Sequence, residues 1–233
     1  EHGADLVWES TTKWIHGSGT TVGGVVVDGG TFDWSAHAED YPEIAQDNPA
    51  YHGVNFAEAM GEQAFMYTAI ARGLRDLGNQ QSPFDAWQTL QGIESLPHRM
   101  PRHCENAMAV AEYLDDHSEV AWVNYPGLSD HETHDNASEY LDGGYGGMIT
   151  FGLEDGYDAG RTMCDEVELA SLLANVGDAK TLIIHPASTT HQQLTEEEQE
   201  ASGTTPDMIR LSVGLEGTQD IIDDLDQAID SAT

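Results

Sequence analysis

The sequence predicts an α/β protein, and three observations support that prediction. Short runs of β-branched and other apolar residues recur along the chain between turn residues, as is typical of strands. They alternate with longer stretches in which apolar residues recur every three or four positions, the period of an amphipathic helix. With 233 residues, of which 39% are hydrophobic, the chain is long enough to bury a core.

The expected strands are the segments richest in β-branched and apolar residues. We expect them at 5–8, 22–30 with a closing turn, 119–125, 146–153, 181–184 and 208–214. Apolar spacing predicts helices at 57–77, 82–96, 101–115, 158–175 and 220–232. Residues 31–55 are rich in His, Asp, Pro and aromatic residues, so we expect an irregular insertion or a functional loop there.

A domain boundary is expected near Ser82, where Ser82 and Pro83 have the form of a helix N-cap followed by proline. The part before it, 1–82, has the composition of a strand-rich and incomplete domain edge. The part after it, 83–233, is a self-consistent α+β unit with flanking helices.

Acidic residues dominate the charge of the chain. Asp and Glu total 42 against 8 Lys and Arg, which gives a net charge of −34 at pH 7. Nucleic acid and anionic membranes are therefore excluded as main partners, because like charges repel. The chain has no run of about 18 apolar residues that would predict a membrane span. Residues 1–5 lack the basic and apolar regions of a signal peptide.

Such acidity occurs in disordered chains and in folded proteins of very salty cytoplasms, where salt screens the repulsion. The recurring strand-like and helix-like runs favour the folded alternative. Cys104 and Cys164 stand alone, without a Cys-x-x-Cys pair. This usage of cysteine fits a reduced cytoplasm. It does not fit a disulfide framework or a cysteine-rich zinc site.

Lys13 is the first candidate for chemistry, because it is one of only two lysines and has the apolar neighbours Trp14 and Ile15. A partly desolvated lysine amine can lose its proton near neutral pH and attack a carbonyl. Ser10 and Thr12 place hydroxyls beside it, and hydroxyls suit a phosphate. Such an amine next to phosphate-binding hydroxyls is what pyridoxal phosphate requires. An ordinary surface lysine is the alternative.

Arg210 is the second candidate, since it interrupts the apolar strand 208–214. A guanidinium there could bind a substrate carboxylate through two hydrogen bonds, or could belong to a structural salt bridge. The loop 185–191 follows another strand and is rich in hydroxyls, but its two histidines lack a third metal ligand nearby. The polar loop 131–135 is a weak metal site, and the glycine run 143–147 is a weak phosphate loop.

Several motifs, in one order and over essentially the whole chain, resemble the cystathionine-metabolism family of pyridoxal-phosphate enzymes. They are the lysine motif at 10–19 and the segments 82–84, 92–96, 99–107, 125–128, 185–191 and 209–216. The segments similar to the O-acetylhomoserine sulfhydrylase branch of that family are 29–34, 49–53, 175–182 and 191–194. The acidity points to a haloarchaeal member.

The resemblance implies a fold and a cofactor. Residues 1–82 would be the C-terminal edge of a large cofactor-binding domain of the type I aminotransferase-like class. Residues 83–233 would be the smaller, C-terminal α+β domain. Pyridoxal 5′-phosphate would be attached to Lys13, and Ser10 and Thr12 would help to hold its phosphate.

The resemblance also implies a reaction. Arg210, assisted by Ser188, would bind the α-carboxylate of an amino-acid substrate, and Lys13 would shuttle protons between Cα, the cofactor and Cβ. In the resulting γ-replacement, O-acetylhomoserine and sulfide or a thiol would give homocysteine or methionine, and acetate. The enzyme would be a cytoplasmic homotetramer of methionine biosynthesis with active sites at its subunit interfaces.

The chain departs from the family in one large respect. Lys13 lies close to the start of this sequence, whereas in the family a long segment precedes the lysine. That segment carries the aromatic that stacks on the cofactor ring, the acid that pairs with the ring nitrogen and more phosphate ligands. We therefore expect the C-terminal half of an enzyme, with the missing N-terminal half as its partner. Glu9 and His16 are smaller departures, at positions where His and Gly are usual.

Two other functions stay open at this point. A cystathionine or methionine γ-lyase, or a cystathionine γ-synthase, is the nearest alternative, and the insertion at 31–55 argues against it. A non-catalytic fragment that only completes an oligomer is the other. The joint presence of Lys13, Ser188 and Arg210 argues against that fragment.

Overall fold

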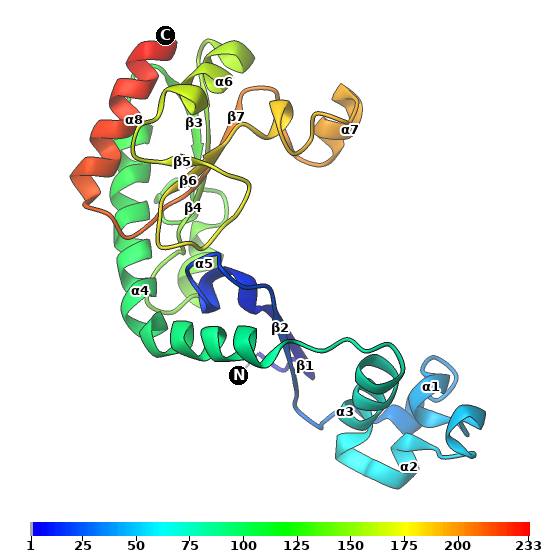
Figure 1. The fold of residues 1–233 in the computed structure, drawn as a ribbon. Coiled ribbons are helices and arrows are strands. Elements are labelled where there is room, and N and C mark those ends of the chain that lie inside the picture. Colours follow the sequence, from blue (N-terminus) through cyan, green and yellow to red (C-terminus); the bar gives the residue numbers. More distant parts are fainter. Residues whose placement is uncertain (1) are drawn as a thin grey trace. The chain divides into compact units, whose positions relative to one another are not determined.

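A computed structural model describes residues 2–233, which form two compact units (Figure 1). Unit 1 contains the residues up to Thr11 and Val22–Trp87, and unit 2 contains Thr12–Thr21 and Gln88–Thr233. The segment that carries Lys13 therefore folds with the C-terminal residues. The division into a cofactor-binding part and a C-terminal domain near residue 82 stays a prediction.

Unit 2 is built on a five-stranded sheet. Its strands are β3 (Val120–Asn124), β4 (Met148–Leu153), β5 (Ser171–Leu172), β6 (Leu182–Ile184) and β7 (Met208–Ser212). They lie in the order β3-β4-β7-β6-β5, and all neighbours are antiparallel except β5 and β6, which are parallel. Leu211 of β7 pairs with Ile149 on one side and Ile183 on the other. These three side chains are fully buried, so the apolar runs of the sequence meet at the centre of the sheet.

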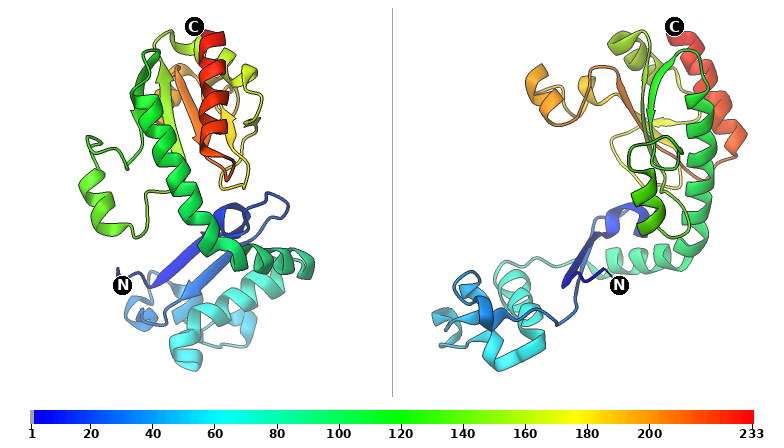
Figure 2. Two further views of the ribbon diagram at one scale, coloured as in Figure 1. Left: turned by 90° about the vertical axis from the view of Figure 1, so that its left-hand side faces the viewer. Right: turned by 180° about the vertical axis from the view of Figure 1, so that it is seen from behind.

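Three helices cover this sheet: α4 (Pro83–Asp115), α6 (Gly156–Glu166) and α8 (Thr218–Ala232). Figure 2 shows α4 and α8 side by side over one face. The core beneath them contains apolar side chains that are completely inaccessible, among them Val110 of α4, Phe151 of β4 and Leu225 of α8. Burial of such side chains is the main term that stabilises the unit.

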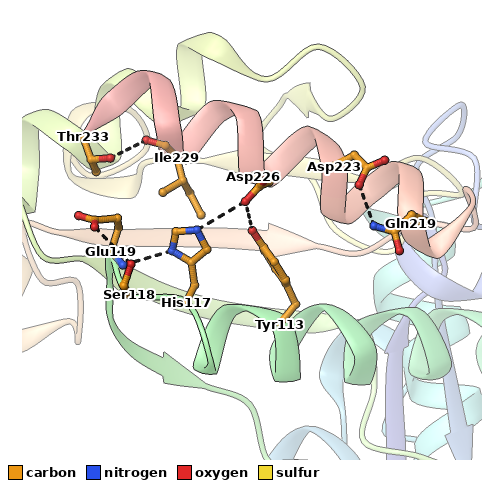
Figure 3. A network of polar contacts seen from close by, with 9 residues as sticks. All are labelled: Tyr113, His117, Ser118, Glu119, Gln219, Asp223, Asp226, Ile229 and Thr233. Atoms are coloured by element: carbon orange, nitrogen blue, oxygen red, sulfur yellow. Dashed lines mark hydrogen bonds and ion pairs between the residues drawn. The ribbon is translucent and has the colours of Figure 1, made fainter.

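A polar network joins the end of α4 to α8 (Figure 3). The Tyr113 hydroxyl donates to the carboxylate of Asp226, and burial together with that carboxylate raises the pKa of Tyr113. His117 accepts a hydrogen bond on Nδ1 from the backbone N–H of Glu119. The proton of a neutral ring therefore lies on Nε2, which faces Asp226 at 3.6 Å. The network fixes the two helices against each other at the surface.

One long helix, α4, replaces the two helices expected at 82–96 and 101–115. Pro97 and Pro101 lie inside it, and each removes one backbone donor and favours a bend, which Figure 1 shows. The carbonyl of Gly92, one turn before the first proline, accepts hydrogen bonds from the side chains of Ser95 and Arg99. These two side chains thus bond a backbone carbonyl on the N-terminal side of the prolines.

Helix α6 is shorter than the expected helix at 158–175. Its C-cap residue Val167 is extended, and the Asp224 carboxylate accepts hydrogen bonds from the backbone N–H groups of Glu168 and Ala170 at 2.7 and 2.8 Å. These contacts from α8 hold the chain in an extended form that leads into β5. The expected helix was too long because the carboxylate that binds the chain after α6, Asp224, is distant in sequence.

Two short helices were not expected from the sequence, and one of them begins in the polar loop 131–135. They are α5 (His134–Tyr140) and α7 (Glu196–Ala201). A capping box formed by Thr195 and Glu198 begins α7. Such a box satisfies two backbone donors and stabilises even a short helix.

Unit 1 contains a two-stranded antiparallel ribbon of β1 (Leu6–Ser10) and β2 (Gly24–Asp28), in which Leu6 pairs with Asp28. Both strands lie where the sequence predicts them. The ribbon is followed by short helical segments, η2 (Trp34–His37), α1 (Pro42–Ala45), η3 (Pro49–Tyr51), α2 (Phe56–Met60), η4 (Gly61–Gln63), α3 (Ala64–Thr68) and η5 (Ala69–Asp76). They bury a small cluster around Trp34, Ile44 and Ala64.

The segments of unit 1 correct two expectations. Residues 31–55 are less irregular than expected, because the side chains of Asp33 and Asn48 cap short helices. The helix expected at 57–77 is interrupted at Gly61, whose φ of +55° lies in the left-handed region. Within residues 2–233, no helix is both long and apolar enough to cross a membrane.

Candidate active site

Lys13 lies in a single helical turn, η1 (Thr11–Ile15), but its own φ of −93° and ψ of −126° are not helical. Its carbonyl accepts a hydrogen bond from the N–H of Gly17 at 2.8 Å. The side chain is half-buried. The turn therefore presents the amine from a bent backbone, with a glycine-rich segment directly after it.

The amine of Lys13 has a specific partner. Nζ donates a hydrogen bond of 2.5 Å to Oδ1 of Asn175, which follows β5 in the chain. The amide oxygen is a neutral acceptor that fixes the direction of one N–H of the amine. Sequence reasoning placed Asn175 only at the start of a motif and gave it no role. The sequence predicted Asn175 as the last residue of a helix at 158–175, so no local signal marked it as a partner of the lysine.

Glycines allow the Asn175 loop to approach the Lys13 turn closely. A side chain at Gly177, whose φ is +75°, would lie 2.6 Å from the backbone nitrogen of Trp14. The N–H of Gly177 donates to Oγ of Ser212 at the end of β7, and the N–H of Ala179 donates to the carbonyl of Gly17, both at 2.9 Å. The loop thus binds the Lys13 turn on one side and the sheet on the other.

Arg210 lies on β7, opposite Thr150 of β4 and Ile184 of β6. It is half-buried, and burial lowers its pKa. Within residues 2–233, the structure contains no ion pair or hydrogen bond of the Arg210 side chain. A partly desolvated guanidinium with open donors is suited to bind a carboxylate through two hydrogen bonds.

The loop 185–191 begins where β6 ends and contains Ser188. His185 is almost completely buried, and its Nε2 lies 2.8 Å from the carbonyl oxygen of Pro206. A carbonyl only accepts, so Nε2 carries the proton, and the Ser188 hydroxyl donates to Nδ1 at 2.9 Å. Burial lowers the pKa of His185, which keeps the ring neutral. The proton of Ser188 is therefore engaged inside the loop.

The two remaining candidates for phosphate contacts precede the lysine in the chain. Thr12 is half-buried and belongs to unit 2, next to Lys13. Ser10 is exposed at the end of β1 and belongs to unit 1.

The weaker motifs have structural explanations. In the polar loop, Nε2 of His131 lies 2.6 Å from Oδ1 of Asn124, and Nδ1 of His134 donates to the carbonyl of Pro126 at 2.9 Å. Among residues 2–233, no three His, Cys, Asp or Glu side chains are placed to hold a metal ion. Gly147 of the glycine run packs against Trp14, where a side chain would not fit.

Comparison with known proteins shows the family to which the chain belongs. The model of the family described as Cys/Met metabolism PLP-dependent enzymes matches residues 1–230. The chain belongs to this family. A homocysteine synthase of Schizosaccharomyces pombe is 50% identical over 232 residues, which are 100% of this chain and 54% of that protein. An O-acetyl-L-homoserine sulfhydrylase of Leptospira meyeri is 48% identical and covers 98% of this chain and 53% of its own length.

Solved structures lead to the same family. A Campylobacter jejuni chain named as an O-acetylhomoserine (thiol)-lyase superposes with a TM-score of 0.91 at 40% identity, covering 99% of this chain and 55% of its own. That structure contains N′-pyridoxyl-lysine-5′-monophosphate. A cystathionine γ-synthase of Xanthomonas oryzae gives a TM-score of 0.77 at 36% identity, with 99% and 51% coverage. The chain thus spans about half the length of its relatives.

The family depends on pyridoxal phosphate, and the residues present fit that group. The half-buried amine of Lys13 is held by a neutral acceptor, which leaves it able to bond an aldehyde carbon. Thr12, next to it in the chain, carries a hydroxyl, a group that can donate a hydrogen bond to a phosphate.

Proposed function

We propose that the protein to which this chain belongs catalyses γ-replacement on O-acetylhomoserine. Sulfide or a thiol forms a bond to Cγ, the bond from Cγ to the acetoxy oxygen breaks, and acetate leaves with that electron pair. The products are homocysteine or, with methanethiol, methionine. The observation that carries the proposal is the oriented amine of Lys13 on Asn175. It occurs in a chain 48–50% identical to proteins named as sulfhydrylases and homocysteine synthases.

Each site residue has a proposed task. Pyridoxal phosphate, when bound, supplies the electron sink that makes protons of the substrate labile. Lys13 holds the cofactor and, once the substrate displaces it, moves protons at Cα and Cβ. Asn175 directs one N–H of that amine and so aims the amine at its targets. Ser10 and Thr12 donate hydrogen bonds to the phosphate.

Arg210 binds the α-carboxylate of the substrate with its open donors. Ser188, whose proton is engaged by His185, supports this contact by holding the loop beside β6 rather than by a direct hydrogen bond to the carboxylate. The carboxylate of the substrate and the carbons at which Lys13 moves protons are thereby assigned to different elements of unit 2.

The full-length protein tests the proposal directly. Incubation of the wild type with O-acetylhomoserine and sulfide should yield homocysteine and acetate. Cysteine in place of sulfide would reveal a cystathionine synthase by its product, and formation of 2-oxobutyrate without any thiol would reveal a γ-lyase. Either of these as the main activity would contradict the proposal.

The two lysines of the chain provide a matched pair of variants. Borohydride reduction followed by peptide mass analysis should place a pyridoxyl group on Lys13 and none on Lys180, which is exposed. Lys13→Ala should abolish both the label and turnover, whereas Lys180→Ala should retain both. Turnover that survives Lys13→Ala would overturn the assignment.

We also propose the setting in which the enzyme works. The remaining half of its relatives' length completes the site, four such subunits assemble, and the compartment is a salty, reduced cytoplasm. The support for salt is the net charge of −34, whose self-repulsion salt screens. The melting temperature of the full-length protein should therefore rise with potassium chloride concentration. A melting temperature unaffected by salt would contradict this setting.

A further inference from the structure

Arg99 of α4 is a charged residue without an obvious reason to be buried. Only 9% of it is exposed, and desolvation lowers its pKa. Within residues 2–233, no carboxylate forms an ion pair with it. A buried charge without a counter-ion is strongly unfavourable unless hydrogen bonds replace the lost water. The partners of its guanidinium therefore indicate what the residue does.

Those partners are four neutral oxygen atoms. Nε donates to Oγ of Ser95 at 2.9 Å, and Nη2 donates to the carbonyl of Gly92 at 2.9 Å, both within α4. Nη1 donates to the carbonyl of Trp14 at 2.9 Å, and Nη2 also donates to the carbonyl of Ile15 at 3.1 Å. Trp14 and Ile15 directly follow Lys13. One guanidinium thus ties the turn that carries the lysine to the helix beside it.

Glycines stand where the Lys13 turn and α4 approach each other most closely. A side chain at Gly17, whose φ is +77°, would collide with the guanidinium of Arg99. A side chain at Gly92 would collide with the backbone of His16. Only glycine at both positions lets the turn lie directly on α4. The turn is therefore held on one side by Arg99 and on the other by the Asn175 loop.

We propose that Arg99 is a positioning residue for the amine of Lys13. By holding the two carbonyls after Lys13, it fixes the backbone from which the side chain extends, and so the direction in which Nζ reaches Asn175. The inference rests on the proposed function, because it assigns Arg99 a part in the chemistry of the lysine. A lysine could not replace it, since an ammonium lacks the planar fork that donates to acceptors in α4 and in the Lys13 turn at the same time.

Arg99→Lys and Arg102→Lys, made in the full-length protein, form a matched pair. Arg102 lies on the same helix, is half-buried and donates to the carbonyl of Glu216 at 3.0 Å, away from the Lys13 turn. Both variants remove one guanidinium from unit 2 and keep the charge. Only Arg99→Lys should disturb the lysine.

Two readouts follow the lysine rather than overall stability. The first is the rate at which the cofactor-free protein captures pyridoxal phosphate, followed by absorbance. The second is the pH at which the absorbance band of the lysine-bound cofactor titrates. We expect Arg99→Lys to slow capture about 10-fold and to move the titration by about half a pH unit. Arg102→Lys should match the wild type in both.

Turnover separates positioning from binding. If Arg99 aims the amine, Arg99→Lys should lower kcat about 10-fold, with KM within about threefold of the wild type. A substrate deuterated at Cα should show a larger isotope effect on kcat in this variant, because the proton transfer made by Lys13 becomes slower. A structural role alone would lower the melting temperature and leave the isotope effect unchanged.

Chemical rescue keeps the inference testable if the lysine variant folds poorly. In Arg99→Ala, free guanidinium at concentrations well below those that denature should restore the capture rate, and ammonium at the same ionic strength should not. Guanidinium should have no effect on Arg102→Ala. Rescue of both variants, or of neither, would count against a specific site for the fork.

The outcomes distinguish a failure of the proposed function from a failure of the role of Arg99 alone. A wild type that takes up no cofactor overturns the proposed function and this inference with it. A wild type that binds cofactor and turns over, while Arg99→Lys and Arg102→Lys behave alike in capture, titration and isotope effect, overturns the role of Arg99 alone.

Discussion

Arg99 and Arg210 occupy two regions of unit 2 that share one residue type and differ in every contact. Burial lowers the pKa of both. The guanidinium of Arg99 is bonded to four neutral oxygens, whereas that of Arg210 has no partner within residues 2–233. The donors around Arg99, the first region, are satisfied by the protein itself. Arg210, in the second region, has donors left for a ligand. The number of satisfied donors distinguishes an arginine that holds the backbone from one that can bind a ligand.

The largest expected effect follows from the open donors of Arg210. Arg210→Met should lower kcat/KM for O-acetylhomoserine by about 100-fold or more, or about 3 kcal/mol, because two charge-assisted hydrogen bonds to the carboxylate are lost. Cofactor capture should be unaffected. The exposed Arg161 of α6 provides the control, Arg161→Met. A lower melting temperature with unchanged kinetics would make Arg210 structural and abolish the contrast with Arg99.

The next effect tests how tightly the Arg99 region is packed. Gly17→Ala combines a left-handed φ with a collision against the guanidinium, whereas Gly143→Ala has a similar φ of +83° and open space. We expect Gly17→Ala to lower the free energy of unfolding by about 2–4 kcal/mol and Gly143→Ala by about 1 kcal/mol. Urea unfolding of the full-length variants measures both. Equal losses of unfolding free energy would mean that Arg99 moves aside at little cost and does not fix the Lys13 turn.

The contrast also shows what the sequence could predict. Lys13 could be singled out because lysine is rare in the chain, and Arg210 because it interrupts an apolar strand. Both signals are local. The partners that define their roles are not: Asn175 lies 162 residues from Lys13, and Arg99 lies 85 residues from Trp14. Apolar periodicity shows which face of a segment is buried, but not which loop will lie against it.

The same limit explains the errors in the fold. The strands were predicted where apolar runs are continuous, with the exception of β5, which has only two residues. The helix at 158–175 was too long because the carboxylate that ends it, Asp224, belongs to the last helix. The two helices expected at 82–96 and 101–115 form one helix, α4, which continues through Pro97 and Pro101. For α6, a tertiary hydrogen bond decided where the helix ends.

A pH effect should sharpen the comparison between the two regions. Burial lowers the pKa of His103, whose ring packs edge-on against Trp14 near the first region, and of His185 beside the second. A lowered pKa means that the unfolded chain binds more protons, so this stability is present above the unfolded value of about 6.5 and is lost as pH falls below it. The urea midpoint should therefore decrease from pH 7.5 to about 5.5.

Substitution isolates the contribution of one ring. His185→Asn should flatten that pH dependence, although its midpoint at neutral pH will be lower because two hydrogen bonds change. Carboxylates that titrate at lower pH act equally on both proteins, so the difference between the two curves reports His185. Identical slopes would show that His185 is not held neutral by its surroundings.

The smallest expected effect concerns Ser188, whose hydroxyl either bonds His185 within the loop or bonds the substrate carboxylate directly. If its hydroxyl serves His185, Ser188→Ala should reduce the free energy of unfolding by about 1 kcal/mol and change KM by less than about threefold. Ser202→Ala, which removes an exposed hydroxyl at the end of α7, is the control. A KM raised about 10-fold or more would instead give Ser188 a direct hydrogen bond to the carboxylate. Arg210 and Ser188 would then bind one carboxylate together.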